Sequence, residues 1–250
     1  MIHLKTPEEI TIMDRANRIV HTVLREVSAA VAPGVVLRDL DRLAESRTKE
    51  LGGKPAFKGY NGYPASICVS INEEVVHGIP GDRTIKEGDL VSLDFGVLLD
   101  GYYGDAATTL PVGQVDAEGF RLLGVTQECL KLAVEKARVG NRVSDVSHAV
   151  QSHAEHNGFS VVREYVGHGI GRALHEEPQV PNWGEPGRGP RLQAGMVLAI
   201  EPMINERGRE VVEEQDGWTV RTRDNGRSAH FEYSVAVTES GPRVLGVKAG

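Results

Sequence analysis

Apolar residues recur at helical spacing in four stretches of the chain, and each stretch is bounded by residues typical of helix ends. The first begins with a capping-box pattern, in which Thr6 is the N-cap, Pro7 occupies the first helical position and Glu9 closes the box. Its apolar stripe runs from Ile10 to Val27. We therefore expect four helices, over about residues 6–32, 37–51, 116–139 and 144–157.

Shorter apolar segments between these helices predict β-strands. Asp100-Gly101 separates two of them and is a strong signal for a two-residue hairpin turn. In that register residue 94 lies opposite residue 107, and residue 105 is a diagonal neighbour on the same face. Because side chains alternate between the faces of a strand, Asp94 and Asp105 are expected to point to one side, close enough to share a metal ion.

The two halves of the chain share a sparse pattern of glycines, aspartates, serines and apolar positions. The overlay joins residues 34–52 with 140–158 and residues 87–94 with 194–201. Chance is the alternative, because the identities are few. A diverged duplication would give one domain, 1–250, with halves of about 5–110 and 116–245, in which Asp94 and Glu201 are equivalent. We expect an α+β fold, with helices on one face of a curved antiparallel sheet.

Five side chains that suit metal binding are spread along the chain: Asp94, Asp105, His168, Glu201 and Glu232. Four lie at or near the ends of predicted strands, and His168 lies in a glycine-rich turn. Carboxylates with one imidazole suit a pair of divalent cations. Four clustered carboxylates would repel one another, and two divalent cations would neutralise them. A hydrolase is therefore the leading interpretation.

Most of these residues also have an ordinary structural interpretation. Asp94 could be a buried aspartate satisfied by the backbone, and Asp105 a turn residue. A lone histidine such as His168 is more often structural or at the surface. Glu201 and Glu232 could be edge glutamates that face water, although the apolar run before Glu201 argues against this for that residue. An unpaired carboxylate in an apolar strand is costly, which favours ligation for Asp94.

Composition and charge narrow the class of protein. The net charge of −7 and the lack of a long basic stretch argue against nucleic-acid binding. Two cysteines, Cys68 and Cys129, are too few for a disulfide scaffold and favour a reducing compartment. The chain begins without an apolar export signal, and no run of about 18 apolar residues predicts a membrane span. We expect a cytoplasmic protein without a membrane partner.

Several motifs together resemble type I methionine aminopeptidase, over roughly residues 5 to 245. The motifs are Gly-Tyr-Pro-Ala-Ser-Ile-Cys at 62–68, Asn-Glu-Glu-Val-Val-His-Gly-Ile-Pro at 72–80, the Asp94–Asp105 hairpin, Gly-His-Gly-Ile-Gly-Arg at 167–172, His-Glu-Glu-Pro at 175–178, Ile-Glu-Pro at 200–202 and Phe-Glu at 231–232. The ligand set is shared with the wider pita-bread metallohydrolases, including prolidase and aminopeptidase P. The 72–80 segment is more specific to the methionine enzymes. The region between His168 and Glu232 has no long insertion, which favours type I over type II.

The resemblance implies a pita-bread fold with pseudo-twofold halves and a role for each ligand. Asp94 would chelate one metal, Asp105 and Glu232 would bridge both, and His168 and Glu201 would complete the other. A metal-bound hydroxide would attack the first peptide bond, with Glu201 as general base and then general acid. The two divalent cations could be cobalt, manganese, iron or zinc.

The resemblance also assigns residues to the substrate. His77 and His175 would hydrogen-bond the scissile amide and the tetrahedral intermediate. The methionine pocket would be walled by Tyr60, Tyr63, Cys68, His77 and Trp218, with Phe57 at its rim, where the family more often has a small residue. Alternatively, the two tyrosines only cover a core edge and the tryptophan is ordinary packing. Asn72 and Ser228 match positions that hold a monovalent cation in some members.

The implied activity is removal of the N-terminal methionine from nascent polypeptides, near the ribosome, with a preference for a small second residue. A monomer is the default oligomeric state. One alternative is an enzyme of the same fold that cleaves Xaa-Pro bonds. Another is a binding module that has lost catalysis, although all five ligand positions and both histidines are filled here.

Overall fold

The first helix begins where the capping box predicts. In the computed structural model, which describes residues 1–247, α1 spans Pro7–Ala30. Thr6 Oγ1 accepts from the Glu9 amide at 3.3 Å, and Glu9 Oε2 accepts from the Thr6 amide at 2.8 Å. Residues 248–250, which the predicted domain includes, lie outside the described part of the chain.

The other predicted helices are present over nearly the expected bounds. They are α2 (Leu37–Glu50), α3 (Ala117–Lys136) and α4 (Val143–His156). Asp116 caps α3 through the Gly119 amide at 2.7 Å. This helix ends at Lys136, earlier than the Gly140 end that the sequence suggested, because its last turn tightens and the Asn141 side chain caps the Lys136 carbonyl at 2.9 Å.

The largest sheet in residues 1–247 has nine strands, and all of its pairs are antiparallel. Its main path runs β1 (Lys54–Pro55), β4 (Leu90–Leu99), β5 (Tyr102–Pro111), β14 (Glu232–Thr238), β9 (Val197–Ile200), β7 (Gly167–Gly169) and β8 (Glu176–Val180). Two further strands join it, β2 (Cys68–Ile71) on β4 and β15 (Gly241–Val244) on β14.

Two small sheets lie beside the main sheet, each with three strands among the described residues. One is formed by β13 (Ser228–His230), β10 (Met203–Asn205) and β6 (Ser160–Val161). The other is formed by β11 (Val211–Glu213), β12 (Val220–Thr222) and β3 (Glu74–Val76). No helix within residues 1–247 has the length and apolar character that crossing a membrane requires.

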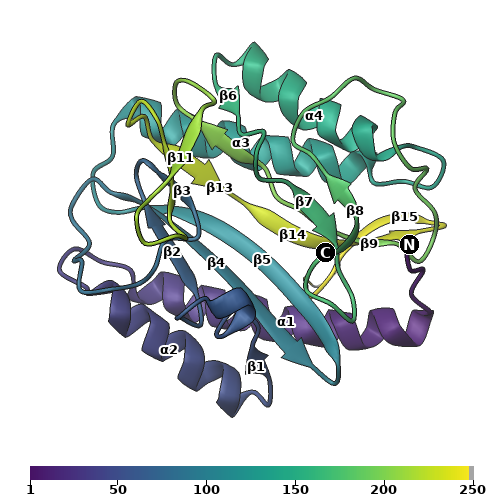
Figure 1. Ribbon diagram of the computed structural model, residues 1–250, viewed down its shortest axis with the longest axis horizontal. Coiled ribbons are helices and arrows are strands. Elements are labelled where there is room, and N and C mark those ends of the chain that lie inside the picture. Colours follow the sequence, from purple (N-terminus) through teal and green to yellow (C-terminus); the bar gives the residue numbers. More distant parts are fainter. Residues whose placement is uncertain (248–250) are drawn as a thin grey trace.

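The four α-helices of the described chain cover the curved main sheet in two pairs, and a 3-10 helix of one turn, Tyr60–Gly62, follows β1. Figure 1 shows α1 and α2 at one end of the view and α3 and α4 at the other, with the long β4–β5 hairpin and β14 between them. Leu40 of α2 shares one core cluster with Phe95 of β4. Val150 of α4 shares another with Leu198 of β9. The predicted α+β class, with helices on the outer face of a curved antiparallel sheet, is confirmed.

The hairpin has the predicted register. Asp94 lies opposite Ala107, and Asp105 lies opposite Gly96, so the two aspartates are diagonal neighbours on one face. Asp100 and Gly101 have φ values of 49° and 81°, the positive values that a type I′ turn requires at both central positions.

Candidate active site

The five predicted ligands come from strands of the main sheet or from residues that adjoin them. Asp94 and Asp105 lie within β4 and β5, rather than at strand ends as expected. Glu201 directly follows β9, where Pro202 interrupts the strand, and Glu232 is the first residue of β14. Strand pairing brings β5 beside β14 and β14 beside β9, which gathers the carboxylates.

His168 lies in a short strand, β7, which corrects the predicted turn. Its backbone pairs with Ala199 of β9. The flanking glycines are needed for close packing: a Cβ on Gly167 would lie 2.4 Å from the Ala199 carbonyl oxygen, and one on Gly169 would lie 2.2 Å from the Glu177 carbonyl oxygen. Glycine therefore lets the strand fit against both neighbours, and the imidazole between them points into the site.

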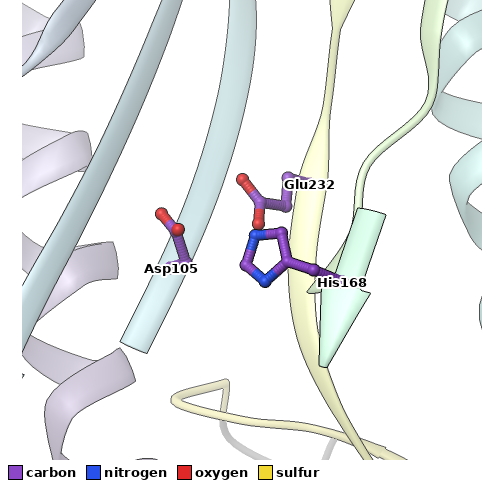
Figure 2. Close-up of side chains that lie close together, drawn as sticks. All are labelled: Asp105, His168 and Glu232. Carbon is purple, nitrogen blue, oxygen red and sulfur yellow. The ribbon is translucent and has the colours of Figure 1, made fainter. Parts of the chain in front are cut away.

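The ligand atoms converge. Asp105, His168 and Glu232 each offer a ligand atom within 4.8 Å of the others, and all three side chains are buried. Figure 2 shows them meeting in the space between β5 on one side and β14 and β7 on the other. Glu201 joins the group, with Oε1 at 3.4 Å from His168 Nε2.

The buried, like-charged carboxylates of the cluster favour the binding of a cation. Burial raises the pKa of Asp94 to about 7, and burial together with the Asp94 charge raises the pKa of Asp105 well above its ordinary value. Burial and the neighbouring carboxylates raise the pKa of Glu201 and Glu232 in the same direction. Within residues 1–247, one oxygen each of Asp94, Asp105 and Glu232 is buried without a hydrogen-bond donor. A divalent cation would satisfy these oxygens and offset the repulsion.

His168 has the tautomer that a metal ligand needs. Its Nδ1 lies 2.9 Å from the Gly169 carbonyl oxygen, so Nδ1 carries the proton and Nε2 presents a lone pair toward Glu201. Burial lowers the pKa of His168 to about 3, which keeps the imidazole neutral. The residues present therefore fit a divalent metal centre.

The cluster forms the floor of a cavity of about 230 Å³. Twelve of the fourteen predicted site residues line it: Phe57, Tyr60, Tyr63, Cys68, His77, Asp94, Asp105, His168, His175, Glu201, Trp218 and Glu232. The structure thus brings the expected ligands and the expected pocket walls into one cavity.

Two histidines lie in this cavity beside the ligands. His77 has a φ of 61°, a region that costs free energy for a non-glycine residue and is often retained at functional sites. Burial lowers its pKa to about 4, so its imidazole is neutral near pH 7. His175 also lines the cavity, its Nδ1 lies 2.7 Å from the Tyr60 hydroxyl, and desolvation lowers its pKa as well.

The apolar side of the cavity is formed by aromatic rings. Tyr63 and Trp218 meet edge to face with centroids 5.0 Å apart, and the Tyr63 hydroxyl donates to the Gly78 carbonyl at 2.9 Å. Phe57 packs against β4, since a Cβ on Gly96 would lie 2.7 Å from its Cε1. The tyrosine and the tryptophan thus serve in packing and also line the cavity.

Asn72 and Ser228 lie outside the cavity. The Ser228 amide donates to the Asn72 carbonyl at 2.8 Å, so the two residues are neighbours. The Asn72 side chain is engaged with Asp89 Oδ1 and the Leu90 amide, at 2.8 and 2.9 Å. A monovalent cation at this place stays a prediction.

Sequence reasoning missed His230, which is 1% exposed and lies with Nε2 at 3.8 Å from Glu201 Oε2. Both of its ring nitrogens are buried without a hydrogen-bond partner in the described chain, and burial lowers its pKa to about 3. The signal was indirect, because His230 ends β13 and Glu232 begins β14, and alternation puts the two residues on one side only if the sequence is read as one continuous strand. Tyr165 and Met203 also line the cavity, and no motif pointed to them.

Comparisons with known proteins identify the family of this chain. Metallopeptidase family M24 matches residues 11–239. The chain is 51% identical over 245 residues to methionine aminopeptidase 1 of Bacillus subtilis, covering 98% of this chain and 99% of that protein. It superimposes on the crystal structure of methionine aminopeptidase from Thermotoga maritima with a TM-score of 0.98 and 49% identity, covering 99% and 100% of the two chains.

A more distant structural relative shares the fold. Prolidase from Pyrococcus furiosus superimposes with a TM-score of 0.81 and 25% identity, covering 99% of this chain and 66% of that one. The pita-bread fold and the resemblance to type I methionine aminopeptidases are both confirmed. The chain belongs to metallopeptidase family M24 and, within it, to the methionine aminopeptidases.

Proposed function

We propose that this enzyme removes the N-terminal methionine from nascent polypeptides in the cytoplasm, acting as a monomer and preferring a small second residue. The observation that carries the proposal is the convergence of Asp105, His168 and Glu232 within 4.8 Å at the floor of a partly apolar cavity. The identity of about half of all residues to methionine aminopeptidases supports the choice of substrate.

The proposed centre would hold two divalent cations. Asp94 would bind one of them, Asp105 and Glu232 would bridge both, and His168 and Glu201 would complete the second. Such cations lower the pKa of water and polarise the scissile carbonyl. The buried carboxylate oxygens support this arrangement, because the described chain offers them no hydrogen-bond donor and a cation would supply the missing partner.

Glu201 is the proposed general base and general acid. Its Oε1 lies 3.4 Å from His168 Nε2, so its carboxylate reaches the place where a metal-bound water would lie. It would accept the proton of the attacking water and deliver it to the leaving amine. The neutral imidazoles of His77 and His175 would donate hydrogen bonds where negative charge develops.

The apolar end of the cavity is the proposed methionine pocket. Tyr60, Tyr63, Cys68 and Trp218 would contact the thioether side chain, and Phe57 would narrow the rim. The enclosed part of the cavity, about 230 Å³, would take the methionine side chain, and crowding next to it would favour a small second residue.

A matched pair of peptides tests this function. The manganese-loaded enzyme is incubated with Met-Ala-Ser and with Ala-Pro-Ser, each with and without chelator. The proposal expects methionine release from the first peptide only, abolished by the chelator. Release of alanine alone would instead identify an Xaa-Pro enzyme, the alternative that the prolidase-like fold allows. No release from either peptide would support the non-catalytic alternative.

A further inference from the structure

A buried ion pair outside the cavity joins the N-terminal segment to the segment that carries His175. Lys5 Nζ donates to Glu176 Oε2 at 2.6 Å, and the two side chains are only 5% and 10% exposed. Glu176 directly follows His175 in the chain. Long charged side chains are rarely buried this far unless they are paired.

Glu176 also closes the loop between β7 and β8. Its Oε1 accepts from the backbone amides of Arg172 and Ala173, at 2.7 and 3.1 Å. Burial opposes ionisation of this carboxyl, but the hydrogen bonds from Lys5 and from the Ala173 amide hold its pKa below the usual value. The charged Glu176 carboxylate therefore forms hydrogen bonds with Lys5, Arg172 and Ala173.

The loop is built around this pair. A Cβ on Gly171 would lie 2.5 Å from Lys5 Cε and 2.7 Å from Glu176 Oε1, so the pair fills the space beside the glycine. Lys5 is itself fixed, because its amide donates to the Gly195 carbonyl at 2.7 Å and its Nζ donates to the His3 carbonyl at 3.1 Å. Lys5 is therefore held by its backbone, by the N-terminal segment and by Glu176.

The loop carries His168 near one end and His175 at the other, and their ring centroids lie 4.2 Å apart. We infer that Lys5 and Glu176 are positioning residues, which set the place of the His175 imidazole relative to His168 and so the hydrogen bond that it gives to the substrate. The part of this inference that concerns substrate rests on the proposed function.

The same loop offers a matched control. Arg172 pairs with Glu9 at 3.2 Å, again linking the loop to the N-terminal segment. The Arg172 side chain is 73% exposed, however, and exposed pairs contribute little. Removing one partner of a buried pair leaves an uncompensated charge, which displaces the groups around it.

The experiment compares full-length, manganese-loaded variants on Met-Ala-Ser. Lys5→Met should lower kcat by about 10- to 100-fold with KM changed less than about twofold, since a displacement of about 1 Å can cost this much in rate. Lys5→Met combined with Glu176→Gln should recover most of the loss, because glutamine is neutral and keeps an oxygen for the two amides. Arg172→Met should stay within about twofold of wild type.

Nitrogen NMR of the histidine side chains, recorded on zinc-loaded protein because zinc is diamagnetic, provides a readout independent of turnover. The His175 signals should shift in Lys5→Met, return in the double variant and stay unchanged in Arg172→Met, with zinc content equal in all. Unchanged His175 signals and kcat in Lys5→Met would overturn the inference, as would equal losses in Lys5→Met and Arg172→Met. If Lys5→Met does not fold, Glu176→Gln alone is held to the same criteria.

Wild-type enzyme that cleaves no methionyl peptide would refute the proposed function, and the NMR comparison would still decide the positioning of His175.

Discussion

His168 Nε2 lies 3.4 Å from Glu201 Oε1, although the two residues belong to different segments of the chain. Backbone pairing of His168 with Ala199 produces this approach, because β7 then runs beside the strand that leads into Glu201. His168 Nδ1 donates its proton to the Gly169 carbonyl. His168 Nε2 and Glu201 Oε1, which face each other, are therefore both hydrogen-bond acceptors. Such a contact is stable when a cation lies between them or when Glu201 is protonated.

Metal content separates the proposed ligands from the proposed substrate residues. Asp105→Asn should lose most of the bound manganese, because it removes a bridging charge from the cluster. His77→Ala should keep the metal and lower kcat by about 10²- to 10³-fold, since it removes only a hydrogen bond to developing charge. Elemental analysis after gel filtration measures the first effect and steady-state kinetics the second. Equal loss of metal in the two variants would contradict the role given to His77.

Stability without metal should fall as pH rises above about 6.5. The folded pKa of Asp94 is raised from 3.8 to about 7, so the folded protein retains a proton that the unfolded chain releases. For this group the stabilising contribution is full at low pH and is lost as pH rises toward about 7. Buried histidines such as His168 and His230, whose pKa values are lowered from 6.5 to about 3, act in the opposite direction below about pH 6.5 and offset this loss there. The melting temperature in chelator should therefore decrease between about pH 6.5 and about pH 8.

Manganese should reverse this trend. At a hundred times its Kd, a cation that binds only the folded state adds about 2.7 kcal/mol, or roughly 5–10 °C for a chain of this size. Calorimetry with manganese and with chelator should give a difference that widens as pH rises, because protons compete with the cation. A difference that is constant or narrows toward high pH would contradict the carboxylate cluster as the binding site.

Phe57 should restrict the first residue of the substrate. Phe57→Cys is expected to increase kcat/KM for peptides that begin with a bulkier residue, relative to methionine, by about 10-fold. It should also lower the free energy of unfolding by about 2–4 kcal/mol, because the ring packs against Gly96 and leaves a cavity. Peptide kinetics and urea unfolding measure the two effects. Phe120→Cys is the matched control, since Phe120 is 50% exposed, and a change of preference there would show that the effect is not local.

Gly78 should be required for the conformation of His77. A Cβ on Gly78 would lie 2.3 Å from the Val69 carbonyl oxygen, so Gly78→Ala must displace the backbone next to His77. We expect a loss of about 1–3 kcal/mol in unfolding free energy and a lower kcat in the folded protein. Gly81→Ala is the control, because no heavy atom lies within 4 Å of the added carbon. Wild-type kinetics in Gly78→Ala would contradict this account of His77.

Local patterns in the sequence predicted much of the fold. The capping box at Thr6 and Glu9 and the Asp100-Gly101 turn each fix structure through neighbouring residues, and both are present as expected. The same turn placed Asp94 opposite Ala107, because a two-residue loop determines the register. The predicted division into two similar halves stays a prediction.

Features that depend on distant segments were harder to predict. His168 lies in a strand because Ala199 and Val180 flank its glycines, and no local pattern carries that information. The partners of Lys5 are equally remote in sequence, so a buried lysine could not be foreseen. His230 could have been found by strand alternation from Glu232, but only with the strand already assigned.

The most direct test of the metal centre is anomalous diffraction from crystals grown with manganese. The account predicts two anomalous peaks within bonding distance of Asp94, Asp105, His168, Glu201 and Glu232, with Asp105 and Glu232 touching both. Crystals grown with ample manganese that show no peak among these five side chains would contradict it.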